Sequence, residues 1–245
     1  MKFENRVAVV TGGAGRIGRE TARMFCEEGV AVALCDISAE GVEKVAAELR
    51  EKGYNCKGYV MDVCSTESVN AAAAKIYADF EKVDILVNNA GRWKCTIFDD
   101  MTEEQWIDTI NLNLHGVFRV TKAFLSGMLE QKYGRIINLT SIAGEVGLPK
   151  FCDYAASKGG LIMMTKTLAM EYGKRNVTFN CVSPGLIMDS WDGNPCKLTW
   201  VERPGFGDEI ARAIVFLAED TASFITGADL TVDGGRILGP RFCDM

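Results

Sequence analysis

Residues 7–18 read VAVVTGGAGRIG, a short run rich in valine that leads straight into a glycine-rich turn. The apolar spacing of residues 17–28 is that of a helix, so the turn joins an expected strand to an expected helix. Glycines let a backbone turn tightly and approach a pyrophosphate, and the start of a helix presents unpaired N–H groups and the positive end of its dipole. Such turns also occur for purely conformational reasons, so the rest of the chain must supply the context that separates the two explanations.

The alternation of strand and helix continues along the chain. Short β-branched runs lie at residues 7–10, 30–35, 59–61, 85–87, 136–139, 178–182 and 230–232. Longer segments with helical spacing lie at residues 17–28, 39–52, 66–80, 103–130, 154–173 and 208–219. Strands that alternate with long helices imply right-handed crossovers and a mainly parallel sheet. We therefore expect an α/β protein, one doubly wound domain of the Rossmann type over residues 1–245, with helices on both faces.

Composition limits the classes of function. Of the 245 residues, 48% are apolar and 24% charged, the balance of a globular protein with a sizeable core. The net charge of −6, without a basic cluster, argues against binding to nucleic acid. No stretch is long enough to span a bilayer, and the first residues lack the apolar core of a signal peptide, so we expect a cytoplasmic protein with no membrane partner. Nine scattered cysteines without a C-x-x-C pair and a single histidine make disulfides, zinc and other metal sites unexpected.

An acidic residue follows the second expected strand. Asp36 stands at about the distance from the glycine turn at which a carboxylate receives the adenosine ribose in a dinucleotide-binding fold. The carboxylate can accept both ribose hydroxyls, and it would repel a 2′-phosphate at a cost of several kcal/mol. Considered singly, Asp36 could equally cap a turn. Together with the glycine turn it favours NAD over NADP.

Two further strand ends carry polar residues. Asp62-Val63 closes the third expected strand, and Asn88-Asn89-Ala90-Gly91 closes the fourth. Ligands of open α/β sheets bind at the carboxyl ends of the strands. We therefore expect these ends and the glycine turn to line one crevice.

A phenol and an ammonium lie four residues apart in an expected helix. Tyr154 and Lys158 should therefore share a helix face, one turn apart. A free phenol titrates near 10, and a neighbouring cation lowers that pKa and makes tyrosine usable as an acid or base. By itself this spacing is more often the edge of an amphipathic helix. Ser141, at the end of the fifth expected strand, can face the same crevice, and this favours a catalytic site.

Together these motifs resemble those of the short-chain dehydrogenase/reductase family over nearly the whole chain. The resemblance rests on Thr11-Gly12 to Gly18, Asp36, Asp62-Val63, Asn88 to Gly91, Asn113, Ser141, Tyr154 with Lys158, Pro184-Gly185 and Asp233-Gly234-Gly235, in order and at compatible spacing. It implies hydride transfer between a nicotinamide cofactor and a small secondary alcohol or ketone. It also implies that Tyr154 transfers the proton, Ser141 holds the substrate oxygen, Lys158 binds the nicotinamide ribose and tunes Tyr154, and Asn113 anchors a water relay. Three residues between tyrosine and lysine are typical of a carbonyl reductase and not of an enoyl reductase.

The resemblance also implies a cofactor site, with NAD expected and NADP less so. Its residues would be Thr11, Gly12, Gly15, Arg16, Ile17, Gly18, Asp36, Ile37, Asp62, Val63, Asn89, Ala90, Gly91, Tyr154, Lys158, Pro184, Gly185 and Ile187. Two positions depart from the family. Arg16 replaces a usual glycine, and a cation beside a phosphate site keeps an NADP-accepting variant open. After Ile187, Ser190 stands near the place of a threonine that often contacts the carboxamide.

Residues 188–206 lack periodicity and resemble the family's substrate lid. Trp191 and Trp200 in this stretch could cover an apolar or ring-shaped substrate, or could pack the loop onto the domain. Trp93 and Phe151 are candidates for the pocket wall.

Polar substrates are also conceivable from the sequence. Asp189, Asp192 and Glu145 could bind the hydroxyls of a sugar or polyol, or could be solvated loop charges. His115 is expected to be a packing or interface residue.

Three functions remain open, and they differ in class. The first is an NAD-linked alcohol dehydrogenase, the second an NADPH-dependent 3-oxoacyl reductase of the acyl-carrier-protein type, and the third a nucleotide-sensing module without catalysis. By resemblance alone we expect a homotetramer, with residues 103–130 contributing to an isologous interface.

Overall fold

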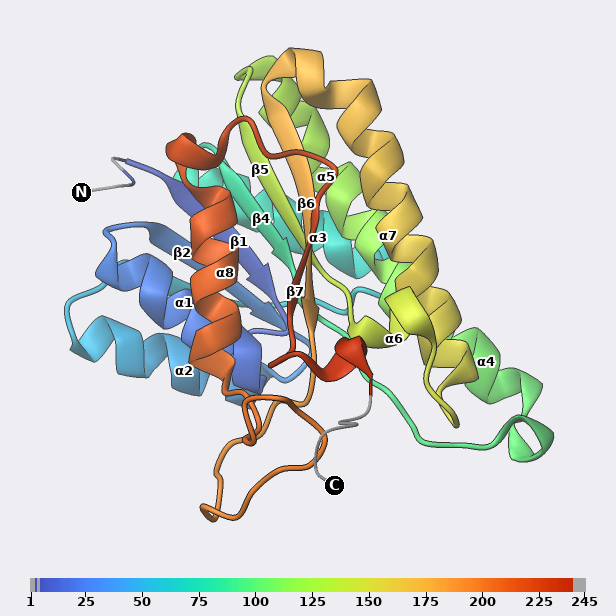
Figure 1. The fold of residues 1–245 in the computed structure, drawn as a ribbon. Coiled ribbons are helices and arrows are strands. Elements are labelled where there is room, and N and C mark those ends of the chain that lie inside the picture. Colours follow the sequence, from blue (N-terminus) through green and yellow to red (C-terminus); the bar gives the residue numbers. More distant parts are fainter. Residues whose placement is uncertain (1–2, 4, 240–245) are drawn as a thin grey trace.

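The computed structural model describes residue 3 and residues 5–239. Its centre is a seven-stranded sheet of order β3-β2-β1-β4-β5-β6-β7, in which every neighbouring pair is parallel (Figure 1). The strands are Val7–Thr11 (β1), Ala31–Asp36 (β2), Cys56–Val60 (β3), Ile85–Asn88 (β4), Gly134–Leu139 (β5), Val177–Pro184 (β6) and Asp229–Val232 (β7). The chain order reverses between β1 and β4, the switch point at which this architecture binds ligands. The expected α/β doubly wound fold is confirmed.

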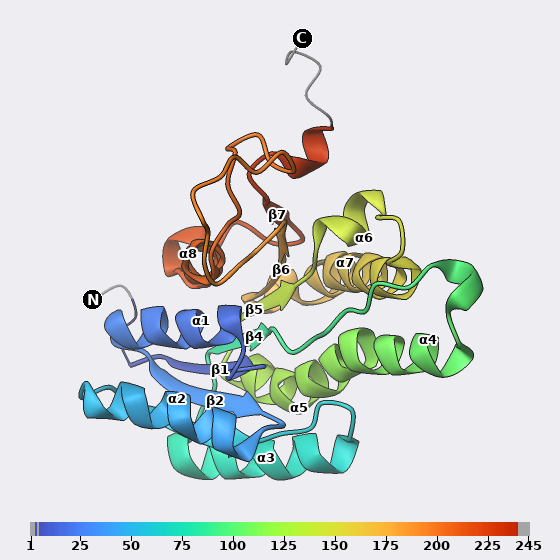
Figure 2. The same ribbon diagram turned by 90° about the horizontal axis from the view of Figure 1, so that it is seen from below.

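Helices cover both faces of the sheet (Figure 2). They are Arg16–Glu27 (α1), Ala39–Glu51 (α2), Thr66–Phe80 (α3), Glu103–Ile110 (α4), Gly116–Glu130 (α5), Ile142–Val146 (α6), Cys152–Tyr172 (α7) and Gly207–Ala218 (α8). α1, α2 and α8 lie on one face, and α3, α4, α5 and α7 lie on the other. The two faces have separate apolar clusters, and β1 supplies both, with Val10 in one and Val9 in the other. This follows from the opposite orientation of successive side chains in a strand.

Three elements differ from the sequence expectation. The third strand is Cys56–Val60 and not 59–61. It is an edge strand in which Cys56 and Tyr59 are buried on opposite faces while Lys57 and Val60 are exposed, so it lacks the continuous apolar run of a central strand. The expected helix 103–130 is interrupted by a π-helical turn at Asn111–His115 (η2). A short helix, α6, follows β5 directly and was not expected.

The stretch from 188 to 206 contains no helix or strand, as expected, and forms a long loop between β6 and α8 (Figure 1). A single bridge between Ile187 and Gly205 closes its base, with Met188 N–H donating to Gly205 O at 3.0 Å. The loop therefore begins and ends at one point beside the carboxyl end of β6.

The described residues offer neither a membrane-spanning helix nor a cluster of metal-binding side chains. None of their helices is long and apolar enough to cross a membrane. Among them, no three His, Cys, Asp or Glu side chains are grouped so that they could hold a metal ion.

Candidate active site

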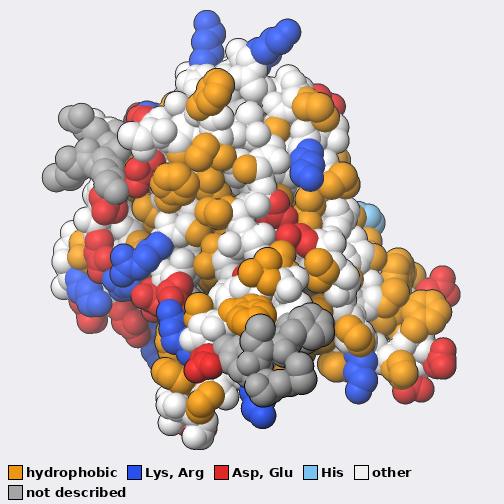
Figure 3. Space-filling view, in the orientation of Figure 1, with side chains coloured by type: hydrophobic (Ala, Val, Ile, Leu, Met, Phe, Trp, Pro, Cys, Tyr) orange, Lys and Arg blue, Asp and Glu red, His pale blue; other side chains and the backbone are white. Residues whose placement is uncertain are grey.

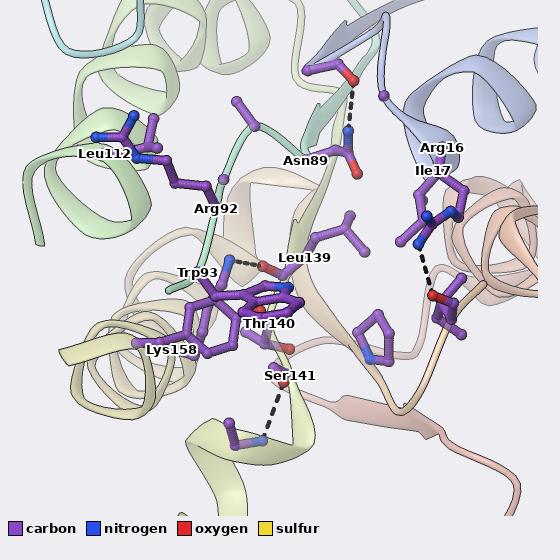
Figure 4. A pocket seen from close by; sticks show the side chains of 18 of the residues that line it. Arg16, Ile17, Asn89, Arg92, Trp93, Leu112, Leu139, Thr140, Ser141 and Lys158 are labelled. Carbon is purple, nitrogen blue, oxygen red and sulfur yellow. Dashed lines mark hydrogen bonds between the residues drawn. The ribbon is translucent and has the colours of Figure 1, made fainter. Parts of the chain in front are cut away.

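A cleft of about 730 Å³ opens at the carboxyl ends of the strands (Figure 4). Its volume lies in the range typical of small-molecule and cofactor sites. Most of the predicted site residues line it: Gly12, Gly15, Arg16, Ile17, Asp36, Ile37, Asp62, Val63, Asn89, Ala90, Gly91, Ser141, Tyr154, Lys158, Pro184, Gly185 and Ile187. The other three, Thr11, Gly18 and Asn113, are buried and do not line the cleft. The structure thus brings the predicted residues to one place.

The glycine turn is held against the end of β4. Gly12 has a φ of +65°, and a Cβ added there would lie 2.9 Å from the Ala90 Cα, so no larger residue fits without a shift. Asn89 Nδ2 donates to Thr11 O and Gly12 O at 2.9 and 3.0 Å. At the start of α1, Gly15 provides no side-chain cap. The turn is therefore a close-fitting backbone cradle in front of a helix N-terminus, which suits an anionic group such as a pyrophosphate.

Asp36 has two roles open to it in this geometry. Its Oδ2 accepts from Ala14 N–H and its Oδ1 from Ser38 N–H, both at 3.0 Å, so it does cap the turn after β2. It also lines the cleft, and a carboxylate has about four acceptor positions. Two positions remain for a ligand, so the capping role leaves ribose binding possible.

Arg16 points away from the adenosine end. Its Nη1 donates to Ile187 O at 2.7 Å and its Nη2 to Asp189 Oδ2 at 2.6 Å, while Arg19 Nη2 donates to Asp189 Oδ1 at 2.9 Å. The Arg16 guanidinium holds the pKa of Asp189 below its ordinary value. We name Arg16, Arg19 and Asp189 the arginine clamp. It joins α1 to the base of the 188–206 loop.

Tyr154 and Ser141 face the cleft from neighbouring elements. Ser141 follows β5 and caps α6, its Oγ accepting from Ala143 N–H at 3.1 Å. Tyr154 lies in the first turn of α7. Burial raises the pKa of Tyr154, and a hydrogen bond with the Ser141 side chain opposes that rise. The phenol is therefore held in its protonated form at neutral pH.

Lys158 lies one turn further along α7 and is buried (Figure 4). Its Nζ donates to Leu139 O at 2.6 Å and lies 5.7 Å from the centre of the Tyr154 ring. Burial lowers the pKa of Lys158 to about 8. The expected lowering of the Tyr154 pKa is wrong for this structure, because desolvation of the phenol is the largest influence on it and the ammonium is directed at a backbone carbonyl.

Asn113 lies in the π-helical turn η2 and is fully buried. Its Oδ1 accepts from Arg92 N–H at 3.0 Å, and its Nδ2 donates to Arg92 O at 2.9 Å. A Cβ on Gly91 would lie 2.9 Å from Asn113 Oδ1 and 3.5 Å from Lys158 Nζ, so both side chains approach the same glycine. π-helical turns are frequent at functional sites because they redirect a side chain. Here the turn brings Asn113 close to Lys158.

Sequence reasoning missed Asp153, which precedes Tyr154 and is fully buried. Its Oδ2 accepts from Gln105 Nε2 at 3.0 Å and from Thr109 Oγ1 at 2.8 Å, and its Oδ1 from Tyr154 N–H at 2.7 Å. These bonds fasten the start of α7 to α4. The partners lie more than 40 residues away, so no local pattern could have revealed the role.

The two tryptophans of the 188–206 loop have partners of their own. Trp191 Nε1 donates to Asn194 O at 2.8 Å, and Trp200 packs on Gly235, where an added Cβ would lie 3.1 Å from the Trp200 Cβ. Neither tryptophan lines the cleft, so packing of the loop is the interpretation that the structure supports. Trp93 and Phe151, the expected wall residues, do line it.

The acidic candidates for hydroxyl binding also lie elsewhere. Asp189 belongs to the arginine clamp, and Asp192 accepts from Asn194 N–H at 3.0 Å. Glu145 accepts from Thr231 Oγ1 at 3.1 Å. None of these three carboxylates, nor Ser190 or His115, lines the cleft.

Comparison with known proteins agrees with this geometry. A family model described as short chain dehydrogenase matches residues 6–191. The chain is 39% identical to the (2S)-[(R)-hydroxy(phenyl)methyl]succinyl-CoA dehydrogenase subunit BbsD of Thauera aromatica, over 97% of this chain and 99% of that protein. It is also 39% identical to the 3-oxoacyl-[acyl-carrier-protein] reductase FabG of Escherichia coli (97% and 100% covered) and 38% identical to the D-threitol dehydrogenase of Mycolicibacterium smegmatis (97% and 95%). The crystal structure of gox2181 superposes with a TM-score of 0.91 at 35% identity, covering 97% of each chain.

Proposed function

The chain belongs to the short-chain dehydrogenase/reductase family, and we propose that it transfers a hydride between NAD(H) and a secondary alcohol or ketone, with Tyr154 as the acid or base. Members of this family are NAD(P)-dependent oxidoreductases that act on small substrates. The observation that carries the proposal is that Ser141, Tyr154 and Lys158 line the same cleft as the glycine turn and Asp36.

The choice of NAD rests on charge at the adenosine end of the cleft. A 2′-phosphate placed beside Asp36 would meet a carboxylate, at a cost of several kcal/mol. Arg16, the residue that kept NADP open, is bonded to Ile187 and Asp189 and not to groups near Asp36. Both observations support NAD.

The chemistry divides between cofactor and protein. A nicotinamide cofactor held by the glycine turn and the strand ends would supply the hydride chemistry of the reaction. The Ser141 hydroxyl is placed to donate a hydrogen bond to the substrate oxygen. In reduction the protonated Tyr154 gives its proton to the ketone oxygen, and in oxidation Tyr154 must first release that proton to solvent before it takes the proton of the alcohol. Lys158 and Asn113 meet at Gly91, where they would hold the ribose and a path for protons to solvent.

The comparisons also support a second candidate function, that of a 3-oxoacyl reductase. The FabG reductases are as similar to this chain as the dehydrogenases are, so an NADPH-dependent 3-oxoacyl reductase is the alternative. The third function, a nucleotide-sensing module without catalysis, is not favoured, because Ser141, Tyr154 and Lys158 all line the cleft.

Cofactor titration separates these proposals. We expect kcat/KM for NADH to exceed that for NADPH by about a hundredfold, since a few kcal/mol separate the two at Asp36. Asp36→Asn removes the charge and should reduce this preference, whereas Glu40→Gln, in the first turn of α2 and outside the cleft, should not. A preference of the wild-type protein for NADPH would reject the NAD assignment and favour the 3-oxoacyl reductase.

Further properties are proposed from the family and the chain. Residues 188–206 would act as a substrate lid of a single catalytic domain, and the protein would work as a homotetramer. The cysteines within the described residues are all free, which fits a reducing compartment such as the cytoplasm.

A further inference from the structure

The charged residues of the cleft are divided by sign along the sheet. Asp36 and Asp62 follow β2 and β3, at one end of the strand order, whereas Arg92 follows β4 and Arg236 follows β7. The acidic side chains therefore belong to the adenosine end. No acidic residue of the described chain lines the cleft on the Tyr154 side of β1, so that side is positive.

An aromatic row leads away from the catalytic phenol. Phe151 lies edge-on to Tyr154, with ring centres 6.3 Å apart, and Trp93 lies edge-on to Phe151 at 5.4 Å. Trp93 lines the cleft and is still 61% exposed, and Figure 4 shows its ring in front of Thr140. A large exposed aromatic ring inside a cleft offers its surface to a ring-shaped ligand.

Hydroxyl side chains that are free to bind a substrate are scarce at this end. Of the hydroxyls that line it, that of Thr140 is engaged with Val182 O at 2.9 Å and Ser183 Oγ at 2.8 Å. Ser141 and Tyr154 remain, and both are needed for the single reacting oxygen. A row of substrate hydroxyls, as in a polyol, would find no matching row of partners among the described residues of the wall.

Two arginines at this end are available for an anion. Arg92 is 68% exposed, and its acidic partner Asp108 lies 4.0 Å away and is equally exposed. Arg236, in the short helix Arg236–Leu238 (η5), is half-buried and lines the cleft. Guanidinium groups bind carboxylates and phosphates in a bidentate manner.

We propose that the substrate is a secondary alcohol or ketone that carries an aromatic ring beside the reacting carbon and an anionic group at its far end. The ring packs on Trp93 and Phe151, and the anionic group meets Arg92 or Arg236, which both line the cleft and follow strands on either side of β5 and β6. This inference rests on the proposed function, because it names the substrate class of the same site.

Four ketones test the two properties independently. Acetophenone and 4-acetylbenzoate carry a ring, without and with a carboxylate, and 2-octanone and 7-oxooctanoate are alkyl counterparts. With NADH at low ionic strength, we expect kcat/KM for the aryl ketones to exceed the alkyl values by about tenfold, and each carboxylate to add a further factor of about three to ten. The carboxylate effect should decline as salt is added.

Amino-acid substitutions test which residues cause the preference for aryl ketones and which cause the preference for a carboxylate. Trp93→Leu should remove the aryl preference, Trp93→Phe should keep most of it, and Trp191→Leu, in the lid but outside the cleft, should leave it unchanged. The double variant of Arg92→Gln and Arg236→Gln should remove the carboxylate preference, whereas Arg175→Gln, at the opposite end of α7, should not. Binding of unreactive 4-isopropylbenzoate to the NADH complex, measured by calorimetry, should weaken in the same double variant.

The possible results separate a failure of the substrate proposal from a failure of the proposed function. If ketones are reduced but the alkyl compounds or polyols are preferred, or if Trp191 and not Trp93 controls the ratio, the inference is overturned and the function stands. If none of the four ketones or their alcohols reacts with either cofactor, both are overturned.

Discussion

Tyr154 and Lys158 share one cleft, and burial acts on both in the direction that removes charge. It raises the pKa of the phenol and lowers the pKa of the ammonium to about 8. At pH 7 the phenol is thus neutral, whereas Lys158 is still mostly charged but loses its proton more easily than a free lysine. A ligand that brings charge or hydrogen bonds into the cleft can change either pKa.

Tyr154→Phe tests the proton-transfer role. The variant keeps the ring and its contact with Phe151 but lacks the hydroxyl, so we expect turnover to fall by a factor of about 10² to 10⁴. NADH binding, measured by fluorescence titration, should be unchanged. Turnover within a factor of about two of wild type would refute the assigned role.

Lys158→Met tests the cost of the buried ammonium. The pKa falls from 10.5 to about 8 on folding, so charged Lys158 costs the folded state about 3 kcal/mol at neutral pH. The unfolded chain keeps this proton up to about pH 10.5. It therefore binds more protons than the folded chain between about pH 8 and 10.5, and the free energy of unfolding rises with pH across this window.

We expect Lys158→Met to abolish turnover and to raise the free energy of unfolding at pH 7 by about 2 kcal/mol, allowing about 1 kcal/mol for the lost bond to Leu139. The gain should shrink as the pH approaches 10. Urea unfolding measures it, and Lys166→Met, on the exposed side of α7, is the control. A variant less stable than wild type at pH 7 would contradict this account.

At the scale of elements, the arginine clamp connects helix α1 with the base of the 188–206 loop. Both ion pairs are partly exposed, so they contribute little to overall stability. Their effect should be local, because they hold Asp189 at the point where the loop leaves β6.

Asp189→Asn weakens both pairs while keeping the side-chain size. We expect KM for the ketone to rise about threefold with little change in kcat or melting temperature, and protease cleavage within residues 188–206 to become faster. Asp192→Asn is the matched control, since this side chain bonds only within its own loop. Equal effects of the two substitutions would show that the clamp has no particular role.

The sequence predicted the elements to different degrees. Fully buried central strands such as β1 are marked by continuous apolar runs, and helix α3 begins and ends as expected, at Thr66 and Phe80. The edge strand β3 was misplaced because half of its side chains face solvent. The turn η2 was missed because apolar spacing is almost unaffected by one extra residue.

The residues of the site could also be predicted only in part. Residues placed by strand ends and helix turns, such as Asp36 and Tyr154, could be assigned to the cleft from the sequence. The Asp153 contacts and the clamp on Asp189 depend on partners brought together only by the fold. The pKa of Tyr154 likewise depends on desolvation, which spacing along a helix does not report.

For the whole molecule, exposed apolar side chains bear on assembly. Figure 3 shows hydrophobic side chains gathered over the face of α8 and β7. Phe216 on α8 is 45% exposed, and Phe224, between α8 and β7 in the chain, is fully exposed. Phe118 on α5 is 55% exposed as well. Apolar surface of this kind is typical of contacts between subunits.

We therefore expect light scattering to give four times the 26.8 kDa mass of one chain. Phe224→Glu should reduce the mass, because it places charge in the apolar face, while Lys52→Glu at the end of α2 should not. A monomer at all concentrations would contradict the tetramer.

The extra residue of η2 also constrains how this chain can be edited or recombined. Deleting one residue from Asn111–His115 would restore a regular α-helix and rotate one side of it against the other by about 100°. Either Asn113 would leave Gly91 or Thr109 would leave Asp153. A chimera with a relative therefore works only if the segment between α4 and α5 is exchanged whole, with its length preserved.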